Sequence, residues 1–179
     1  MTITTHKSQL DVRAAGKTYH LDFRQAFRFG YTLLRTRKYE DAVRVFEALA
    51  RLGGSDPLPA IMLAYCKAGM KDFETSNTLL CAAFSDEGKG KAEQLQAVFV
   101  YLSVGMWADG IDELTKMVRQ YPDLPIICLL LGDVLVSQRK RTKAILCWRL
   151  AIARDHDDGA VAAVARRSIS SQVKPPTKT

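Results

Sequence analysis

The chain has 179 residues, of which 47% are hydrophobic and 25% charged, and its formal net charge is +7. This length fits one domain with a continuous core, and the composition excludes a disordered chain. The longest apolar run, 126–136, is interrupted by Gly132 and Asp133, and the first ten residues lack the apolar centre of a signal peptide. We therefore expect no membrane span and a cytoplasmic protein.

The first 52 residues divide into a polar arm and a helical pair. Residues 1–20 show no apolar period, and we predict a flexible or partly extended arm there. From Leu21 the apolar residues follow helical spacing, with Asp22 available as a start signal. After a turn at 36–38, a second helix is predicted over 39–52.

The rest of the chain repeats this alternation of apolar helical stretches with Gly, Pro or polar breaks. Helices are predicted over 58–68, 72–84, 91–104, 106–120, 125–137, 142–154 and 160–171. The last of these would cover the open face of the helices before it. The tail, 172–179, is predicted to be disordered.

A 34-residue period links these helices. One set of markers, taken at each step of 34, is Tyr39, Ala42 and Phe46, then Phe73, Ser76 and Leu80, then Trp107, Gly110 and Leu114, then Arg141, Ala144 and Trp148. A second set of small or apolar pairs keeps the same step: Phe29-Gly30, Leu63-Ala64, Ala97-Val98 and Leu131-Gly132. Such a register is typical of paired antiparallel helices, in which small residues allow close approach and an aromatic fills the gap to the next pair.

On these markers the chain resembles the tetratricopeptide repeat (TPR) family, in four copies at about 23–56, 57–90, 91–124 and 125–158. The resemblance implies an all-α fold, a right-handed TPR solenoid of four helix-turn-helix repeats with a C-terminal capping helix at 160–171. The whole of 21–171 would then form a single TPR domain.

A narrower resemblance covers residues 27–84. The stretch FRFGYTLLRTRKYEDAVRVFEALARL, followed by AYCKAGMKDFETS, is similar to the first two repeats of the class II chaperones of bacterial type III secretion. These are small cytoplasmic TPR proteins that hold translocator subunits in an apolar groove. The sequence differs from them in its fourth well-formed repeat and its basic C-terminal end.

The TPR resemblance implies a concave groove lined by the first helix of each repeat. In this sequence the groove residues for a protein or peptide partner would be Arg24, Phe27, Tyr31, Leu34, Arg35, Leu58, Ile61, Tyr65, Leu95, Phe99 and Leu102. The fourth copy would add Leu129, Asp133 and Val136. The alternative for several of these side chains is a core position, covered by the N-terminal arm or by a dimer partner.

The sequence carries no pattern typical of catalysis or of cofactor binding. Its three histidines are far apart, and none stands at metal-ligand spacing from a Cys or a carboxylate. The four cysteines lie in apolar helical stretches, which is typical of buried thiols in a reducing compartment. We therefore predict a protein that is not an enzyme and has no cofactor or metal.

Two hypotheses of function follow. The first is a non-catalytic module that binds an extended or helical segment of a protein partner in the groove, in its most specific form a type III secretion chaperone. The second is a structural or assembly protein whose apolar surface is buried in a homo-oligomer, for example a homodimer.

The densest basic cluster, Arg139, Lys140, Arg141 and Lys143, falls at the predicted turn of the fourth repeat. A solvated turn is the ordinary explanation of such a cluster, and docking of an acidic partner or a nucleic acid is the alternative. No aromatic residues alternate with these charges, which argues against a nucleic-acid module.

Overall fold

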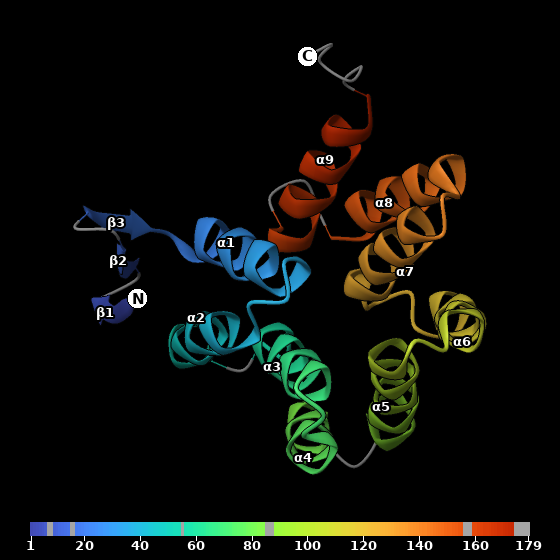
Figure 1. Ribbon diagram of the computed structural model, residues 1–179, viewed down its shortest axis with the longest axis horizontal. Coiled ribbons are helices and arrows are strands. Elements are labelled where there is room, and N and C mark those ends of the chain that lie inside the picture. Colours follow the sequence, from blue (N-terminus) through green and yellow to red (C-terminus); the bar gives the residue numbers. More distant parts are fainter. Residues whose placement is uncertain (7–8, 15–16, 55, 85–87, 156–158, 174–179) are drawn as a thin grey trace. The chain divides into compact units, whose positions relative to one another are not determined.

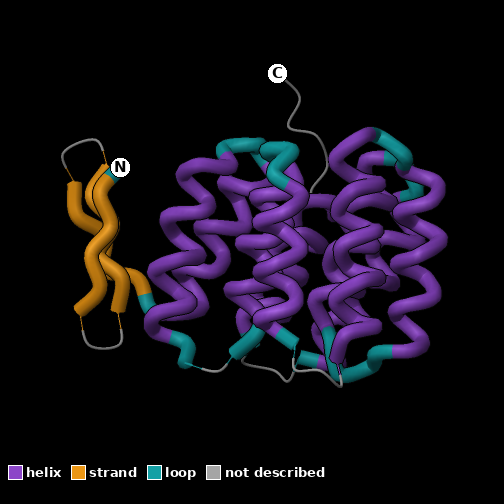
Figure 2. The backbone as a smooth tube through the Cα atoms, turned by 90° about the horizontal axis from the view of Figure 1, so that it is seen from below, coloured by secondary structure: helices purple, strands orange, loops and turns teal. Residues whose placement is uncertain are grey.

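The computed structural model describes residues 1–6, 9–14, 17–54, 56–84, 88–155 and 159–173. Within them the chain forms a three-stranded sheet followed by nine helices (Figures 1 and 2). The helices are α1 (Phe23–Arg35), α2 (Tyr39–Leu52), α3 (Leu58–Gly69), α4 (Phe73–Ala83), α5 (Lys89–Val104), α6 (Trp107–Gln120), α7 (Pro125–Ser137), α8 (Arg141–Arg154) and α9 (Ala160–Val173). The predicted all-α class of helical repeat is confirmed.

The chain divides into two compact units, Met1–Met106 and Trp107–Thr179. In the first unit α1 packs on α2, α2 on α3, α3 on α4 and α4 on α5. In the second unit α6 packs on α7, α7 on α8 and α8 on α9. The predicted domain 21–171 therefore spans both units, and the two helices of its third repeat lie on either side of the division.

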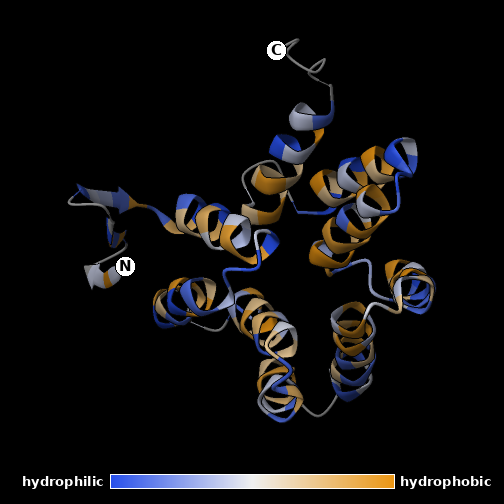
Figure 3. Cartoon of the chain, viewed as in Figure 1, coloured by the Kyte–Doolittle hydropathy of each residue, from blue (hydrophilic) through white to orange (hydrophobic). Residues whose placement is uncertain are grey.

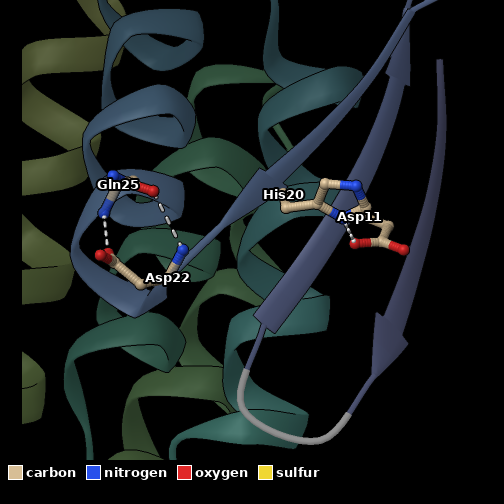
Figure 4. Close-up of polar contacts among 4 residues, drawn as sticks. All are labelled: Asp11, His20, Asp22 and Gln25. Carbon is tan, nitrogen blue, oxygen red and sulfur yellow. Dashed lines mark hydrogen bonds and ion pairs between the residues drawn. The ribbon is translucent and has the colours of Figure 1, made fainter.

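The ends of the helices follow the sequence signals closely. Asp22 caps α1: its Oδ1 accepts a hydrogen bond from the N–H of Gln25 at 2.7 Å, and the Gln25 Oε1 accepts one from the N–H of Asp22 at 3.2 Å (Figure 4). This reciprocal pair is a capping box, which satisfies two backbone donors at the helix start. At the other end of the chain, α9 continues to Val173, two residues beyond the predicted limit, and residues 174–179 of the predicted tail lie outside the described residues.

The turns between paired helices share one backbone geometry at the 34-residue period. One residue in each turn has a positive φ: Arg37 (59°), Lys71 (68°), Gly105 (85°) and Arg139 (59°). The N–H of the following residue donates to a carbonyl five residues back, from Lys38 to Leu33, Asp72 to Lys67, Met106 to Tyr101 and Lys140 to Leu135, at 2.8 to 3.0 Å. This bond is that of the Schellman motif, which ends a helix through a left-handed residue. The backbone therefore confirms the period that the side chains predicted.

Small residues allow the paired helices to approach, as the markers predicted. A Cβ on Gly30 would lie 3.0 Å from the ring of Phe46, and one on Gly132 would lie 2.4 Å from the indole Nε1 of Trp148. A Cβ on Gly69 would lie 2.6 Å from the ring of Tyr39, which belongs to the preceding repeat. These three aromatic markers thus occupy the space that a glycine leaves open.

The described residues of the N-terminal arm are extended and pair into an antiparallel sheet, which the sequence did not predict. Its strands are β1 (Thr2–His6), β2 (Gln9–Ala14) and β3 (Lys17–Leu21), paired in sequence order with Ile3 opposite Val12 and Val12 opposite Tyr19. The sheet packs on α1 and α2, and Leu10 and Val12 are buried. The alternation of apolar and polar residues that is typical of a strand is therefore present in β2. Only Leu10 and Val12 carry it, and two apolar residues in a polar segment are too few to predict a strand.

The most apolar helix is α7, which is hydrophobic along almost its whole length (Figure 3). Nine of its 13 residues are buried. A membrane span needs about 20 apolar residues, and in the part of the chain that the structure describes no helix is long and apolar enough to cross a membrane. The apolar character of α7 serves the core of the second unit.

Candidate functional site

The predicted partner-binding residues of the first unit lie on α1, α3 and α5, which we call the first-helix row. Neighbouring members of this row are in contact, α1 with α3 and α3 with α5. Seven of the predicted residues are buried: Phe27, Tyr31, Leu34, Ile61, Leu95, Phe99 and Leu102. Leu58 and Tyr65 are half-buried, and Arg24 and Arg35 are exposed.

The aromatic residues of α1 have a core position. The Phe27 and Tyr31 rings stack with their centroids 6.1 Å apart, and Phe27 meets Phe46 of α2 edge-on at 5.7 Å. Tyr31 is only 2% exposed. Phe27 thus packs α1 on α2 and Tyr31 is buried beside it, and the role of both side chains in binding a partner stays a prediction.

Tyr65 and Phe99 are the aromatic pair of the row with an accessible side. Their rings are nearly parallel, 14° apart, with centroids separated by 4.7 Å. Phe99 is fully buried whereas Tyr65 is half-buried. The stack therefore favours one orientation of a tyrosine ring that solvent reaches in part, because stacked aromatic pairs contribute about 0.5 to 1.5 kcal/mol beyond the area that they bury.

The predicted residues of the fourth repeat have structural contacts. Leu129 is buried, and Val136 is half-buried. Asp133 accepts a hydrogen bond from the Trp148 indole Nε1 at 3.1 Å. Because Trp148 is fully buried, this bond satisfies its one polar atom, and Asp133 thereby fixes the contact between α7 and α8.

The second repeat departs from the usual marker residues for a reason that the structure supplies. Ser76, at the position where alanine is usual, is buried, and its Oγ donates to the Oε1 of Gln96 at 2.8 Å. The Nε2 of Gln96 donates to the carbonyl of Phe73 at 3.0 Å. This network ties α4 to α5, and a serine and a glutamine twenty residues apart give no sequence signal that would have revealed it.

The reactive side chains of the described residues form no metal site, since no group of three or more His, Cys, Asp or Glu residues there could hold a metal ion. Burial raises the pKa of the Cys66 thiol to about 12 and that of the Cys147 thiol to about 11, so both are protonated at neutral pH. His20 lies at the exposed face of the sheet, where its Nδ1 is 2.6 Å from the Oδ1 of Asp11 (Figure 4).

Comparison with known proteins identifies no family. No model of a known protein family matches the chain, and no curated protein matches it. Among solved structures, MamA (residues 41 to the end) from Desulfovibrio magneticus RS-1 is 18% identical over 84% of this chain and 89% of its own, with a TM-score of 0.40. A second MamA RS-1 structure, an ArsTM double mutant, is 19% identical over 85% of this chain and 97% of its own, with a TM-score of 0.39. At this level of likeness no function is transferred to the chain.

Proposed function

We propose that the chain is a non-catalytic protein-interaction module that binds an extended or helical segment of a protein partner along the first-helix row. The observation that carries the proposal is the Tyr65–Phe99 stack, in which a buried ring holds a half-exposed tyrosine in one orientation. Rigid, amphipathic aromatic side chains are typical anchors of protein interfaces, because little conformational entropy is lost when a partner packs on them.

The other accessible residues of the row complement this anchor. Leu58 adds a half-exposed apolar side chain on α3, the same helix as Tyr65. Arg24 and Arg35 are exposed near the two ends of α1, about 16 Å apart along the helix axis. A guanidinium binds carboxylates with defined geometry, so the two arginines would set the direction of a bound segment that carries acidic residues.

In its most specific form, the proposed partner is a translocator subunit of a type III secretion system and the site of action is the cytoplasm. What supports this form is the resemblance of residues 27–84 to class II secretion chaperones. The segment corresponds to most of α1 together with α2, α3 and α4.

The experiment compares two tyrosines of similar burial. Partners are captured from cytoplasm with the intact chain, and the affinity of the captured partner is then measured for the intact chain, Tyr65→Ala and Tyr101→Ala. Tyr101 is half-buried on α5 but was not predicted to line the groove. We expect Tyr65→Ala to weaken binding roughly tenfold or more and Tyr101→Ala to change it little.

Equal losses in the two variants would contradict the proposal. Tyr31→Ala is unsuitable for this test, because Tyr31 is buried against Phe27 and its removal would disturb the fold. Light scattering on the same samples addresses the homo-oligomer hypothesis. A dimer of the intact chain that Tyr65→Ala converts to a monomer would show that the row binds a second copy instead.

A further inference from the structure

The outward face of α8 carries two leucines whose side chains are partly exposed. The core side of this helix consists of Ala144, Trp148 and Ala151, all fully buried. On the opposite side Leu146 is 59% exposed and Leu150 is 37% exposed. Ala153, also exposed, continues the row. These three residues, which we call the α8 stripe, follow the spacing i, i+4, i+7 that places side chains along one line of a helix.

The repeat itself does not require this stripe. The residues one, two and three periods before Leu146 are Asp112, Thr78 and Arg44, and all three are exposed and polar. The residues that precede Leu150 by one, two and three periods are Lys116, Ala82 and Ala48, of which the first two are exposed and Ala48 is buried. An exposed leucine at the Leu146 position thus distinguishes the fourth repeat from the other three.

Cations flank the α8 stripe on both sides. Helical geometry places Lys143 on one side of Leu146 and Arg149 on the other, and both are exposed. Arg139, Lys140 and Arg141 continue the positive charge at the start of the helix, and α8 itself contains no Asp or Glu. Among the described residues, none of these five cations makes an ion pair.

From this arrangement we infer that the α8 stripe docks an amphipathic helical segment of a protein partner, whose apolar residues are flanked by Asp and Glu. Leucines at i and i+4 form a ridge that fits between the side chains of a second helix. Flanking cations select acidic residues beside that contact, as charged positions at the edge of a helical seam select their partners. This surface is separate from the first-helix row, and the inference does not depend on the function proposed for that row.

The charges argue against two other occupants. A second copy of α8 would bring one set of cations against another, and like charges in an interface oppose association. A membrane surface would match the charge, but binding to lipid scales with the apolar area that is inserted, and the α8 stripe offers only two leucines and an alanine. Trp148 of the same helix is fully buried and adds nothing to that area.

The test uses a designed peptide, because the natural partner is not identified. The probe is a fluorescent synthetic helix of about 18 residues, five turns, with leucines on one face and glutamates on both flanks. Its counterpart carries lysines in place of the glutamates. Binding of each to the full chain is measured by fluorescence anisotropy. We expect the acidic peptide to bind and the basic peptide to fail, and the binding to weaken with added salt.

Two double variants locate the binding on α8. Leu146→Thr with Leu150→Ala gives α8 the residues that α4 has at these positions, Thr78 and Ala82, with no change of charge. Lys143→Gln with Arg149→Gln removes the flanking cations. We expect either double variant to weaken binding of the acidic peptide roughly tenfold. The control, Arg28→Gln with Arg119→Gln, removes two exposed cations from other helices and should leave the affinity unchanged.

Three results would overturn the inference. The first is a failure of the acidic peptide to bind, or equal binding to the Leu146→Thr, Leu150→Ala variant. The second is binding to phosphatidylserine vesicles that this variant loses, with no difference between the two peptides, which would identify a lipid surface. The third is a dimer of the intact chain that becomes a monomer in this variant, which would identify a second copy. Circular dichroism confirms that each variant is folded.

Discussion

The second helices of the first and fourth repeats, α2 and α8, have equivalent core sides and opposite outer sides. Ala42 and Phe46 of α2 correspond to Ala144 and Trp148 of α8, and all four are fully buried. On the outer side, however, α2 has charged residues such as Glu40, Arg44 and Glu47. The α8 stripe has Leu146, Leu150 and Ala153 where α2 has Arg44, Ala48 and Arg51.

The two helices also differ in what covers them. The N-terminal sheet packs on α2, where the Arg44 Nη1 donates to the carbonyl of Met1 at 3.2 Å. The two leucines of the α8 stripe, by contrast, are 59% and 37% exposed. The comparison separates two roles within one repeat. The core side keeps the 34-residue period because its residues must fit against the neighbouring helix. The residues of the outer side have no such constraint, so they can differ between repeats according to what each one contacts.

The largest expected effect comes from emptying the core side of either helix. Phe46→Ala and Trp148→Ala should each lower the free energy of unfolding by about 3 to 5 kcal/mol, because each leaves a large cavity against a glycine. Trp148→Ala also removes the hydrogen-bond donor of Asp133. Urea titrations followed by circular dichroism measure both losses.

The matched control for this prediction is Trp107→Ala. Trp107 is the aromatic marker of the third repeat, but it is half-buried, so its removal should cost clearly less than that of Trp148. If Phe46→Ala proved as mild as Trp107→Ala, the core sides of α2 and α8 would not be equivalent.

The helices and their period could be predicted from the sequence because each repeat carries the same local signals. Nearly every helix end was predicted to within two residues. The signals were the apolar spacing, the capping residue Asp22 and the glycines 53, 69 and 105. The pairs Gly30 with Phe46 and Gly132 with Trp148 could be predicted as close contacts, because the period places them at matching positions.

Burial within the candidate site could not be predicted in the same way. A first-helix position is buried or accessible according to which neighbour covers it, and the sequence does not state this. Tyr31 and Tyr65 hold equivalent positions 34 residues apart, yet Tyr31 is enclosed with Phe27 whereas Tyr65 keeps an accessible side. The α8 stripe was missed because leucine in an apolar helix is ordinarily assigned to the core.

A smaller effect tests the turns that precede α2, α6 and α8. Arg37 and Arg139 hold a left-handed backbone, which costs a residue with a Cβ about 1 to 2 kcal/mol, whereas Gly105 adopts it without that cost. Gly105→Ala should therefore destabilise the chain by about 1 kcal/mol. Arg37→Gly and Arg139→Gly should stabilise it by up to about 1 kcal/mol, because the relief of strain exceeds the added freedom of the unfolded chain.

Thermal unfolding of the three variants measures this effect, with Arg28→Gly as the control. Arg28 is exposed in the interior of α1, where glycine should destabilise by about 0.5 to 1 kcal/mol. A loss of stability in Arg37→Gly as large as that in Arg28→Gly would show that the left-handed turn carries no strain.

The smallest effect concerns the charges in the first turn of each helix, where α2 and α8 carry residues of opposite sign. Asp41 in the first turn of α2 interacts favourably with the helix dipole, whereas Lys143, three periods later in the first turn of α8, opposes it. Asp41→Lys should therefore lower the free energy of unfolding by about 0.3 to 1 kcal/mol, and Lys143→Asp should raise it by a similar amount. Urea titrations at low salt measure the two changes, and the same titrations in 1 M salt should show both reduced by screening.

A gain of stability in Lys143→Asp would also bear on the α8 stripe. It would mean that Lys143 lowers the free energy of unfolding of the intact chain, which is expected of a side chain whose role is to attract an acidic partner. The same variant should bind the acidic peptide more weakly than the intact chain does, so stability and binding would change in opposite directions. If Lys143→Asp instead lowered both, Lys143 would support the structure of α8, and its charge would carry no information about a partner.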